Sequence, residues 1–239
     1  DLKGPNFQQE DESLDKPAPL CNTLRHWQEK DEEYFINYRR HFYAMVTGVD
    51  MAIGEILEML RNRGELDDTL IVFSSDHGDM CGDHNAVSKH VSFYDELMHL
   101  PLILFWPNGL GAEPRRVSGL VEMVDLLPTL LGLCNTNIPR VMAGNDYSDS
   151  LLNCEEIPGR EDVLAYHAPD FFMLRSNNYK YIRYAEDKEV LYDLQQDPGE
   201  TINQAGNAEY ADALNQMRYR SVGRLAAASQ SCLPRYFEF

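Results

Sequence analysis

The stretch TLIVFSSDHGDMCGDHNAVSK, residues 69–89, decides how this chain is expected to fold. It begins with a short apolar run, residues 70–73, that stops abruptly at polar side chains. Such a run predicts a fully buried β-strand. A second apolar run, LPLILFWP at residues 100–107, predicts another core strand. Two core strands separated by a polar loop indicate an α/β sheet, in which ligands bind just past the carboxyl ends of the strands.

The polar loop after the first strand is dense in side chains that bind ions: Asp76, His77, Asp79, Asp83, His84 and Lys89. Carboxylate and imidazole groups can hold a cation, and a cation together with a lysine can hold an oxyanion. This pattern predicts an ester hydrolase that acts on sulfate or phosphate. The alternative is an ordinary polar turn in which Gly78 supplies a positive φ. The dense recurrence of acidic and histidine residues favours the site.

A helical period precedes this loop. Apolar residues recur at three- and four-residue intervals over residues 31–63, with acidic residues at the start and Arg61, Arg63 and Gly64 at the end. This pattern predicts one or two amphipathic helices. Asp125 is expected to cap a further helix that carries Pro128 in its first turn.

The character of the sequence changes after about Pro158. Short strand-like runs cover residues 162–166, 171–175, 179–184 and 190–192, and residues 176–178 predict a hairpin turn between two of them. A helical pattern follows at residues 208–228. We therefore expect a small antiparallel sheet with a packed helix at the C-terminal end.

The composition limits the possible partners. The 239 residues include 39 acidic and 21 basic side chains, a formal net charge of −18, which argues against binding to nucleic acid or to an anionic membrane. No apolar run reaches the length of about 18 residues that a membrane span needs. The five cysteines lack a paired metal-ligand spacing. No Asn-x-Ser/Thr acceptor occurs, which favours a periplasmic or secreted bacterial enzyme over a glycosylated lysosomal one.

In their order and spacing, short motifs along nearly the whole chain resemble the sulfatase family of the alkaline phosphatase superfamily. The motifs are YAMVTGVD (43–50), SDHGD (75–79), GDH (82–84), KH (89–90), LPLI (100–103), VDLLPTLL (124–131), YKYI (179–182), LYDL (191–194) and DPGE (197–200). The resemblance implies part of an alkaline-phosphatase-like mixed α/β sheet flanked by helices. Residues 1–158 would be the C-terminal part of the catalytic domain, and residues 159–239 a small α+β subdomain.

The resemblance also assigns roles to individual residues. Asp76 and His77 match metal ligands, with His77 at a position where other members carry asparagine. Lys89 matches the lysine that contacts the sulfate oxygens, so it is both a catalytic and a substrate-binding candidate. His90 is a further catalytic candidate, and His167 a candidate substrate contact. The usual metal of the family is Ca²⁺, although imidazole is not a preferred calcium ligand, so the identity of the divalent metal stays open.

Two family features are not found in the sequence. Sulfatases use a formylglycine made from Cys or Ser in a C/S-x-P-S-R motif, which none of the five cysteines matches. The family's first pair of metal-binding Asp residues, after its first strand, also has no match here. The chain begins at Asp1 without a methionine, and the resemblance begins well inside the family's catalytic domain. We therefore expect a C-terminal half, with the formylglycine nucleophile on the missing N-terminal half, which would be a partner of this chain.

The expected substrate is a sulfated small molecule or glycan. A phosphodiesterase or phosphonate monoester hydrolase of the same superfamily shares the Asp-His and Lys pattern and remains an alternative. A second alternative, from another class, is a non-catalytic fragment that retains only the fold.

Overall fold

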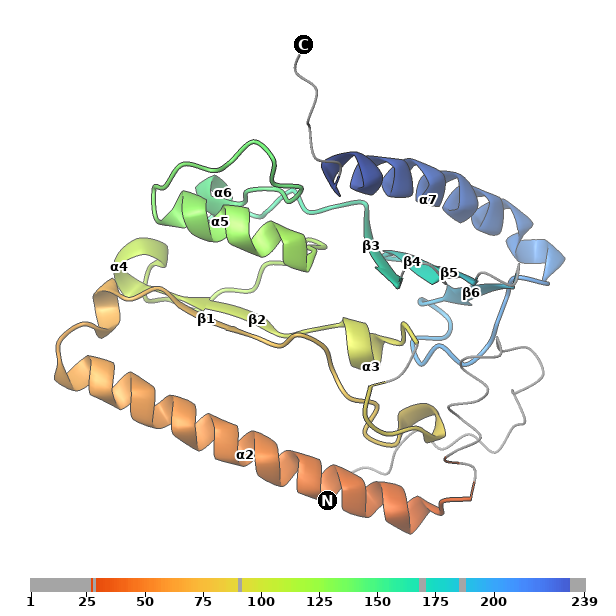
Figure 1. The fold of residues 1–239 in the computed structure, drawn as a ribbon, viewed down its shortest axis with the longest axis horizontal. Helices are drawn as coiled ribbons and strands as arrows, with labels where there is room; N and C mark the ends of the chain where they lie inside the picture. Colours follow the sequence, from red (N-terminus) through yellow and green to blue (C-terminus); the bar gives the residue numbers. More distant parts are fainter. Residues whose placement is uncertain (1–26, 28, 90–91, 168–170, 185–187, 233–239) are drawn as a thin grey trace. The chain divides into compact units, whose positions relative to one another are not determined.

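Figure 1 shows the protein as a computed structural model, in which residues 27, 29–89, 92–167, 171–184 and 188–232 are described. The chain divides into two compact units, Asp1–Ala112 and Glu113–Phe239. This division lies earlier than the change of sequence character near residue 158. Among the helices in the described ranges, none has both the length and the apolarity needed to cross a membrane.

The first unit begins with one long helix, α2 (Glu32–Asn62), where the sequence pattern allowed one or two helices. Asp31 caps it by accepting a hydrogen bond from the backbone N–H of Tyr34, at 2.9 Å. Acidic residues occupy the first turn and Arg61 the last turn, as the helix dipole favours. The chain leaves the helix through Gly64, whose φ of +70° suits glycine.

The strands β1 (Ile71–Ser74) and β2 (Leu102–Phe105) form a two-stranded antiparallel sheet, so the two predicted strands do lie in one sheet. The expectation of full burial is wrong. Val72, Phe73 and Ile103 are 36%, 39% and 56% exposed, because the described residues do not cover both faces of this sheet. Short elements complete the unit: η2 (Leu66–Asp68), η3 (Asp83–Asn85), α3 (Asp95–Met98) and α4 (Pro107–Leu110).

The second unit opens with η4 (Met123–Asp125), α5 (Leu126–Leu133) and α6 (Ser148–Leu152). Asp125 precedes α5 as predicted, but its carboxylate does not cap that helix. It accepts hydrogen bonds from the backbone of Glu122 at 2.8 Å and Asn145 at 2.7 Å, and it pairs with the guanidinium of Arg160. The carboxylate thus binds the Arg160 guanidinium and two backbone N–H groups instead of the N–H groups at the start of α5.

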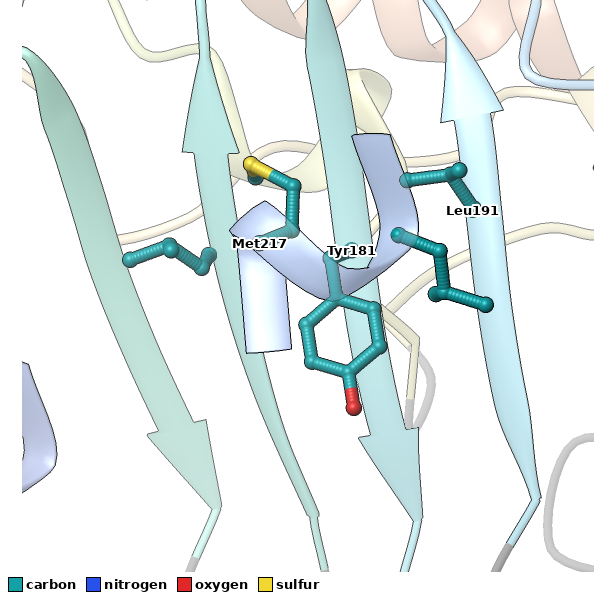
Figure 2. Packing of buried hydrophobic residues seen from close by; sticks show 5 residues of the cluster. Tyr181, Leu191 and Met217 are labelled. Atoms are coloured by element: carbon teal, nitrogen blue, oxygen red, sulfur yellow. The ribbon is translucent and has the colours of Figure 1, made fainter. Parts of the chain in front are cut away.

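Four strands then form an antiparallel sheet in the order β3-β4-β5-β6. Their bounds are Asp162–His167, Phe171–Ser176, Tyr179–Tyr184 and Glu189–Asp193, and a short η5 (Ala208–Tyr210) leads into α7 (Ala211–Cys232). These elements confirm the predicted strands, hairpin and helix. α7 packs on the sheet, and Figure 2 shows Met217 of this helix beside Tyr181 and Leu191 of the strands. This cluster is the core of the second unit.

Residues before the sheet are tied to it, which explains why the second unit starts before residue 158. The Glu122 carboxylate accepts a hydrogen bond from the backbone N–H of Leu164 in β3, at 2.6 Å. Leu120 forms an isolated bridge with Arg160. The segment that begins at residue 113 is therefore hydrogen-bonded to the small sheet and belongs to the same unit.

Candidate functional site

Asp76, His77 and Lys89 of the predicted site lie on one segment, residues 75–89, which we call the site loop. It follows β1 and folds back on itself, with Met80, Ala86 and Val87 each no more than 1% exposed. Gly78 binds this loop to α3 through a hydrogen bond from its N–H to the Leu97 carbonyl, at 3.0 Å. A Cβ at residue 78 would lie 1.8 Å from the Glu96 carbonyl oxygen, so only glycine fits. Gly78 is thus required for close backbone approach.

The backbone of the site loop is strained. Cys81, His84, Asn85 and Ser88 all have a positive φ, between 48° and 64°. A non-glycine residue in this region costs about 1–3 kcal/mol and persists only where surrounding contacts enforce it. Such contacts must therefore be present around the loop.

Asp79 makes some of the contacts that hold the loop backbone in this conformation. One of its carboxylate oxygens accepts hydrogen bonds from the backbone N–H groups of Cys81, at 2.8 Å, and Ser88, at 3.0 Å. The other accepts a hydrogen bond from the hydroxyl of Tyr38 in α2, at 2.9 Å. Burial, followed by the hydrogen bond to Asp79, raises the pKa of Tyr38 to about 12, so the phenol stays protonated and donates. Asp79 therefore shapes the loop between residues 81 and 88.

Arg39, also in α2, holds the middle of the site loop. Its Nε donates to the Cys81 carbonyl and its Nη2 to the Asp83 carboxylate, both at 3.0 Å. The side chain is buried although it carries a charge. Sequence analysis did not single out this residue. The available signal was its place one helical turn after Phe35, on the apolar stripe of α2.

Asp76 and His77 lie at the start of the loop and are accessible, with side chains 85% and 37% exposed. His77 Nδ1 lies 2.8 Å from the Gly78 carbonyl oxygen. Because a carbonyl only accepts, Nδ1 carries the proton, and Nε2 is left with its lone pair in the neutral ring. His77 Nε2 is 3.6 Å from the nearer Asp76 carboxylate oxygen. The two atoms are therefore close enough to bind one ion.

The charge at this position is favourable for cation binding. The pKa of Asp76 is lowered, chiefly by the hydrogen bond from the His77 backbone N–H and to a smaller extent by the positive charge of Lys89. Lys89 itself is exposed at the end of the site loop. The positive charge of Lys89 thus favours the ionised form of Asp76 slightly, although thirteen positions separate the two residues in the sequence.

The other predicted site residues have different surroundings. His84 is buried and its ring stacks on Tyr94, with centroids 3.7 Å apart, so it packs inside the loop. His90 lies outside the described residues. His167 ends β3 in the second unit, where its exposed ring stacks on Phe171 with centroids 5.2 Å apart.

The donor set can be compared with what a cation needs. A carboxylate oxygen and an imidazole nitrogen fixed by a backbone carbonyl are a common pair of metal ligands. Hard cations such as Ca²⁺ take about six to eight ligands and prefer oxygen, whereas imidazole suits transition metals. In the described ranges, no group of three or more His, Cys, Asp or Glu side chains converges in a geometry that could hold a metal. Asp76 and His77 therefore fit a metal site that other residues complete.

The cysteine in the loop has no reactive character. Burial, followed by the charge of Asp79, raises the pKa of Cys81 to about 12, so its thiol stays protonated at neutral pH. Cys134 and Cys154, in the second unit, are exposed free thiols. The nucleophile of a hydrolase is not provided by Cys81.

Two family models match this sequence. The sulfatase model covers residues 5–136, and the model of the N-sulphoglucosamine sulphohydrolase C-terminal region covers residues 82–226. The delta 4,5-hexuronate-2-O-sulfatase of Bacteroides thetaiotaomicron is 31% identical in an alignment 232 residues long, which covers 89% of this chain and 47% of that enzyme. Arylsulfatase K of Homo sapiens is 32% identical in an alignment 185 residues long, which covers 71% of this chain and 34% of that protein. The chain thus spans less than half the length of these relatives.

Solved structures share the fold. A 2-O GAG sulfatase matches with a TM-score of 0.80 and 26% identity, over 97% of this chain and 54% of that one. A protein solved in complex with its substrate D-glucosamine-2-N,6-O-disulfate matches with a TM-score of 0.76 and 26% identity, over 92% and 47% of the two chains. The phosphonate monoester hydrolase of Agrobacterium radiobacter matches with a TM-score of 0.73 and 27% identity, over 85% and 43%.

Proposed function

Because this chain belongs to the sulfatase family, we propose that it contributes Asp76, His77 and Lys89 to the active site of a sulfuric ester hydrolase. The observation that carries the proposal is the arrangement of the first two residues. The Gly78 carbonyl fixes the His77 tautomer, and the free Nε2 lies 3.6 Å from the Asp76 carboxylate. Two ligand atoms that are each about 2.0–2.6 Å from one cation can lie at such a separation.

Each residue has a defined task in the proposed site. Asp76 and His77 would hold a divalent cation, which supplies positive charge beside the oxygens of the sulfate ester when it is bound. Asp76 stays ionised because its pKa is lowered, so it brings negative charge to the cation across the neutral pH range. Lys89, an exposed ammonium near Asp76, would contact the sulfate oxygens and stabilise the charge that grows on the leaving alcohol oxygen.

The metal of this site is proposed to be Ca²⁺, the usual metal of the family. His77 in the ligand set makes a softer divalent ion an outcome to be tested. The attacking group is proposed to be a formylglycine from a part of the protein outside these 239 residues, because no C/S-x-P-S-R motif occurs among them. His90 and His167 stay candidates for substrate contact.

We further propose that the rest of the catalytic domain packs on the first unit. Apolar side chains are exposed on β1, β2 and the second half of α2, including Ile103 at 56%, Val49 at 55% and Ile56 at 54%. So many exposed apolar side chains are unusual on an independent soluble unit and favour an interface. The relatives are more than twice as long as the matched part of this chain, so they contain the sequence needed to cover it.

The substrate class is proposed to be a sulfated small molecule or glycan. A relative is named a hexuronate 2-O-sulfatase, and a structural neighbour was solved with a disulfated glucosamine. The net charge of −18 would repel polyanions at long range, so the sulfate group must be captured locally. Lys89 is the described side chain that we assign to this capture.

The test uses the full-length protein with matched aryl sulfate, phosphodiester and phosphonate monoester substrates. We expect preferential sulfate ester hydrolysis that is lost on chelation and restored by one divalent ion. Asp76→Asn should lower the affinity for that ion, and Glu65→Gln, an exposed carboxylate elsewhere in the first unit, should not. A strong preference for the diester or phosphonate would replace this proposal with the hydrolase class of the Agrobacterium neighbour.

The rival from another class is a non-catalytic module that retains the fold. The accessible pair of Asp76 and His77 favours the enzyme, because a purely structural loop does not need exposed ligand atoms on its rim. Absence of a C/S-x-P-S-R motif from the full-length sequence, together with no turnover of any of the three substrates, would establish the rival.

A further inference from the structure

We infer that Tyr38 and Arg39 of α2 are positioning residues for the site loop, and that they set the orientation of His77 and Lys89 from outside the active site. The inference deepens the proposed function, on which it rests. Neither residue needs to touch substrate or metal. Their action passes through Asp79, Cys81 and Asp83, which contact neighbouring backbone and side chains of the loop.

The first connection runs from Tyr38 to both ends of the loop. The Tyr38 hydroxyl binds the Asp79 carboxylate at 2.9 Å. Asp79 is two residues after His77, and its other oxygen binds the N–H of Ser88 at 3.0 Å. Ser88 immediately precedes Lys89. A single phenol hydroxyl therefore fixes the carboxylate that joins the metal-ligand end of the loop to the lysine end.

The second connection holds the middle of the loop. The Arg39 guanidinium reaches the Cys81 carbonyl and the Asp83 carboxylate, both at 3.0 Å, from a largely buried position. Cys81 and Ser88 are two of the four non-glycine residues with positive φ in the loop. A backbone in this conformation keeps its shape only while outside contacts impose it. The fork of an arginine imposes two contacts at once, which a lysine cannot do.

The helix is a suitable base for these contacts. Tyr38 and Arg39 are adjacent in α2, a continuous helix of 31 residues that is capped at Asp31. Side chains on a rigid helix hold their partners more accurately than side chains on loops. The site loop carries the proposed metal ligands, and α2 holds the backbone of that loop in place.

The experiment uses the full-length protein and substitutions that remove single contacts. Tyr38→Phe deletes the hydroxyl and keeps the ring, and Arg39→Lys keeps the charge but loses the fork. The matched controls are Tyr43→Phe and Arg40→Lys, on the same helix, since Tyr43 is 46% exposed and the exposed Arg40 bonds to Asn37 of α2. These milder variants avoid the unfolding that Arg39→Ala risks.

Three readouts separate positioning from general stability. Amide hydrogen exchange at Cys81 and Ser88 should be about five- to tenfold faster in Tyr38→Phe, because their common acceptor is released. The affinity for Ca²⁺, measured by titration calorimetry, should fall in both variants. The value of kcat should fall by roughly tenfold, less than the hundredfold that a misplacement of about 1 Å can cost. The controls should match the parent in all three.

The outcomes decide the inference independently of the proposed function. Faster exchange at these two amides with an unchanged melting temperature supports positioning, even if the parent protein hydrolyses no sulfate ester. Unchanged exchange in Tyr38→Phe and Arg39→Lys overturns it. A loss of kcat that appears only with a matching loss of folded protein also overturns it, because the effect would then be stability alone.

Discussion

The two sheets of this molecule, compared with each other, show what burial depends on. The central strand β5 of the second unit is covered on both faces: its neighbours Tyr181 and Ile182, on opposite faces, are 1% and 2% exposed. The strands β1 and β2 are just as apolar, yet Ile103 is 56% exposed. α7 packs on the four-stranded sheet (Figure 1), whereas the described residues leave much of the two-stranded sheet open. The local sequence determines where a strand forms, and the elements that pack on the sheet determine whether that strand is buried.

The comparison teaches that the two units have different degrees of independence. The second unit contains its own core, centred on Leu174, Tyr181, Leu191, Leu214 and Met217. The first unit has a closed region around the site loop and an open apolar surface on β1, β2 and the second half of α2. Three predictions compare substitutions in the two units, and one compares two residues of the site loop in the first unit.

The largest effect is expected at the buried ion pair of the second unit. Lys180 and Glu200 pair while 0% and 2% exposed. Lys180→Met removes the ammonium group that faces the buried Glu200 carboxylate, and breaking such a buried pair costs about 3–5 kcal/mol of unfolding free energy. Arg63→Met breaks an exposed pair with Glu65 in the first unit and should cost less than about 1 kcal/mol. Urea denaturation of the full-length protein measures both.

The double variant Lys180→Met with Glu200→Gln serves as the control for this prediction, because it removes both charges. It should recover a large part of the stability that Lys180→Met loses. Equal costs for Lys180→Met and Arg63→Met would show that burial does not distinguish the two units.

The next effect concerns the two cores. In the chain of 239 residues, Leu191→Ala should lower the unfolding free energy by about 2–5 kcal/mol, because it opens a cavity in the packed cluster. Ile103→Ala should stay within about 0.5 kcal/mol, as surface substitutions do. In the full-length protein, Ile103→Ala should become as costly as Leu191→Ala. An Ile103 variant that stays neutral there would argue against the proposed packing of the rest of the catalytic domain on β1 and β2.

These two sheets also show how much of the fold the sequence contains. Alternating apolar residues and the Asn177–Asn178 turn are local signals, and they placed β4 and β5 within one residue of the observed bounds. The exposure of Ile103 was not predictable, because it depends on residues that do not neighbour it in the sequence. The same holds for Asp125. We expected its carboxylate to cap a helix, but it binds the guanidinium of Arg160, 35 positions away.

The candidate residues of the site could be chosen from the sequence, but the contacts that support them could not. Asp76, His77 and Lys89 were selected from residue types just past a strand and from the family resemblance, and their roles stay predictions. The contacts of Tyr38 and Arg39 span 41 to 44 positions in the sequence. Short motifs cannot reveal such contacts. The roles assigned to His90 and His167 stay predictions.

The third effect separates activity from stability within the first unit. In the full-length protein, Lys89→Ala should lower turnover by on the order of a hundredfold or more, since one donor to developing charge is lost. Its melting temperature should stay unchanged because Lys89 is exposed. Asp79→Ala should reduce turnover less than Lys89→Ala, by at least the roughly tenfold expected for Tyr38→Phe, and it should also lower the melting temperature, because three hydrogen bonds to that carboxylate are lost. Steady-state kinetics beside thermal melts tests this, and equal losses of turnover would mean that the two roles are wrongly assigned.

The smallest effect is expected from acid, and it should act on the second unit. Hydrogen bonds from Arg218, together with those from Tyr181 and Arg183, lower the pKa of Glu189 to about 2 from its usual 4.5. A carboxylate whose pKa is lower in the folded state stabilises the fold above its unfolded pKa, and this contribution disappears as the pH falls toward the folded pKa. The contribution of Glu189 is therefore complete at pH 7 and decreases between about pH 4.5 and about pH 2.

Glu189→Gln should lower the melting temperature at pH 7 and reduce its further fall between pH 5 and pH 3, as scanning calorimetry can follow. Glu65→Gln, at the exposed pair of the first unit, is the matched control and should leave the pH profile unchanged, because solvent screens that pair. If both variants shifted the pH profile of the melting temperature equally, the acid response would arise from the net charge of the molecule and not from the hydrogen bonds of Glu189.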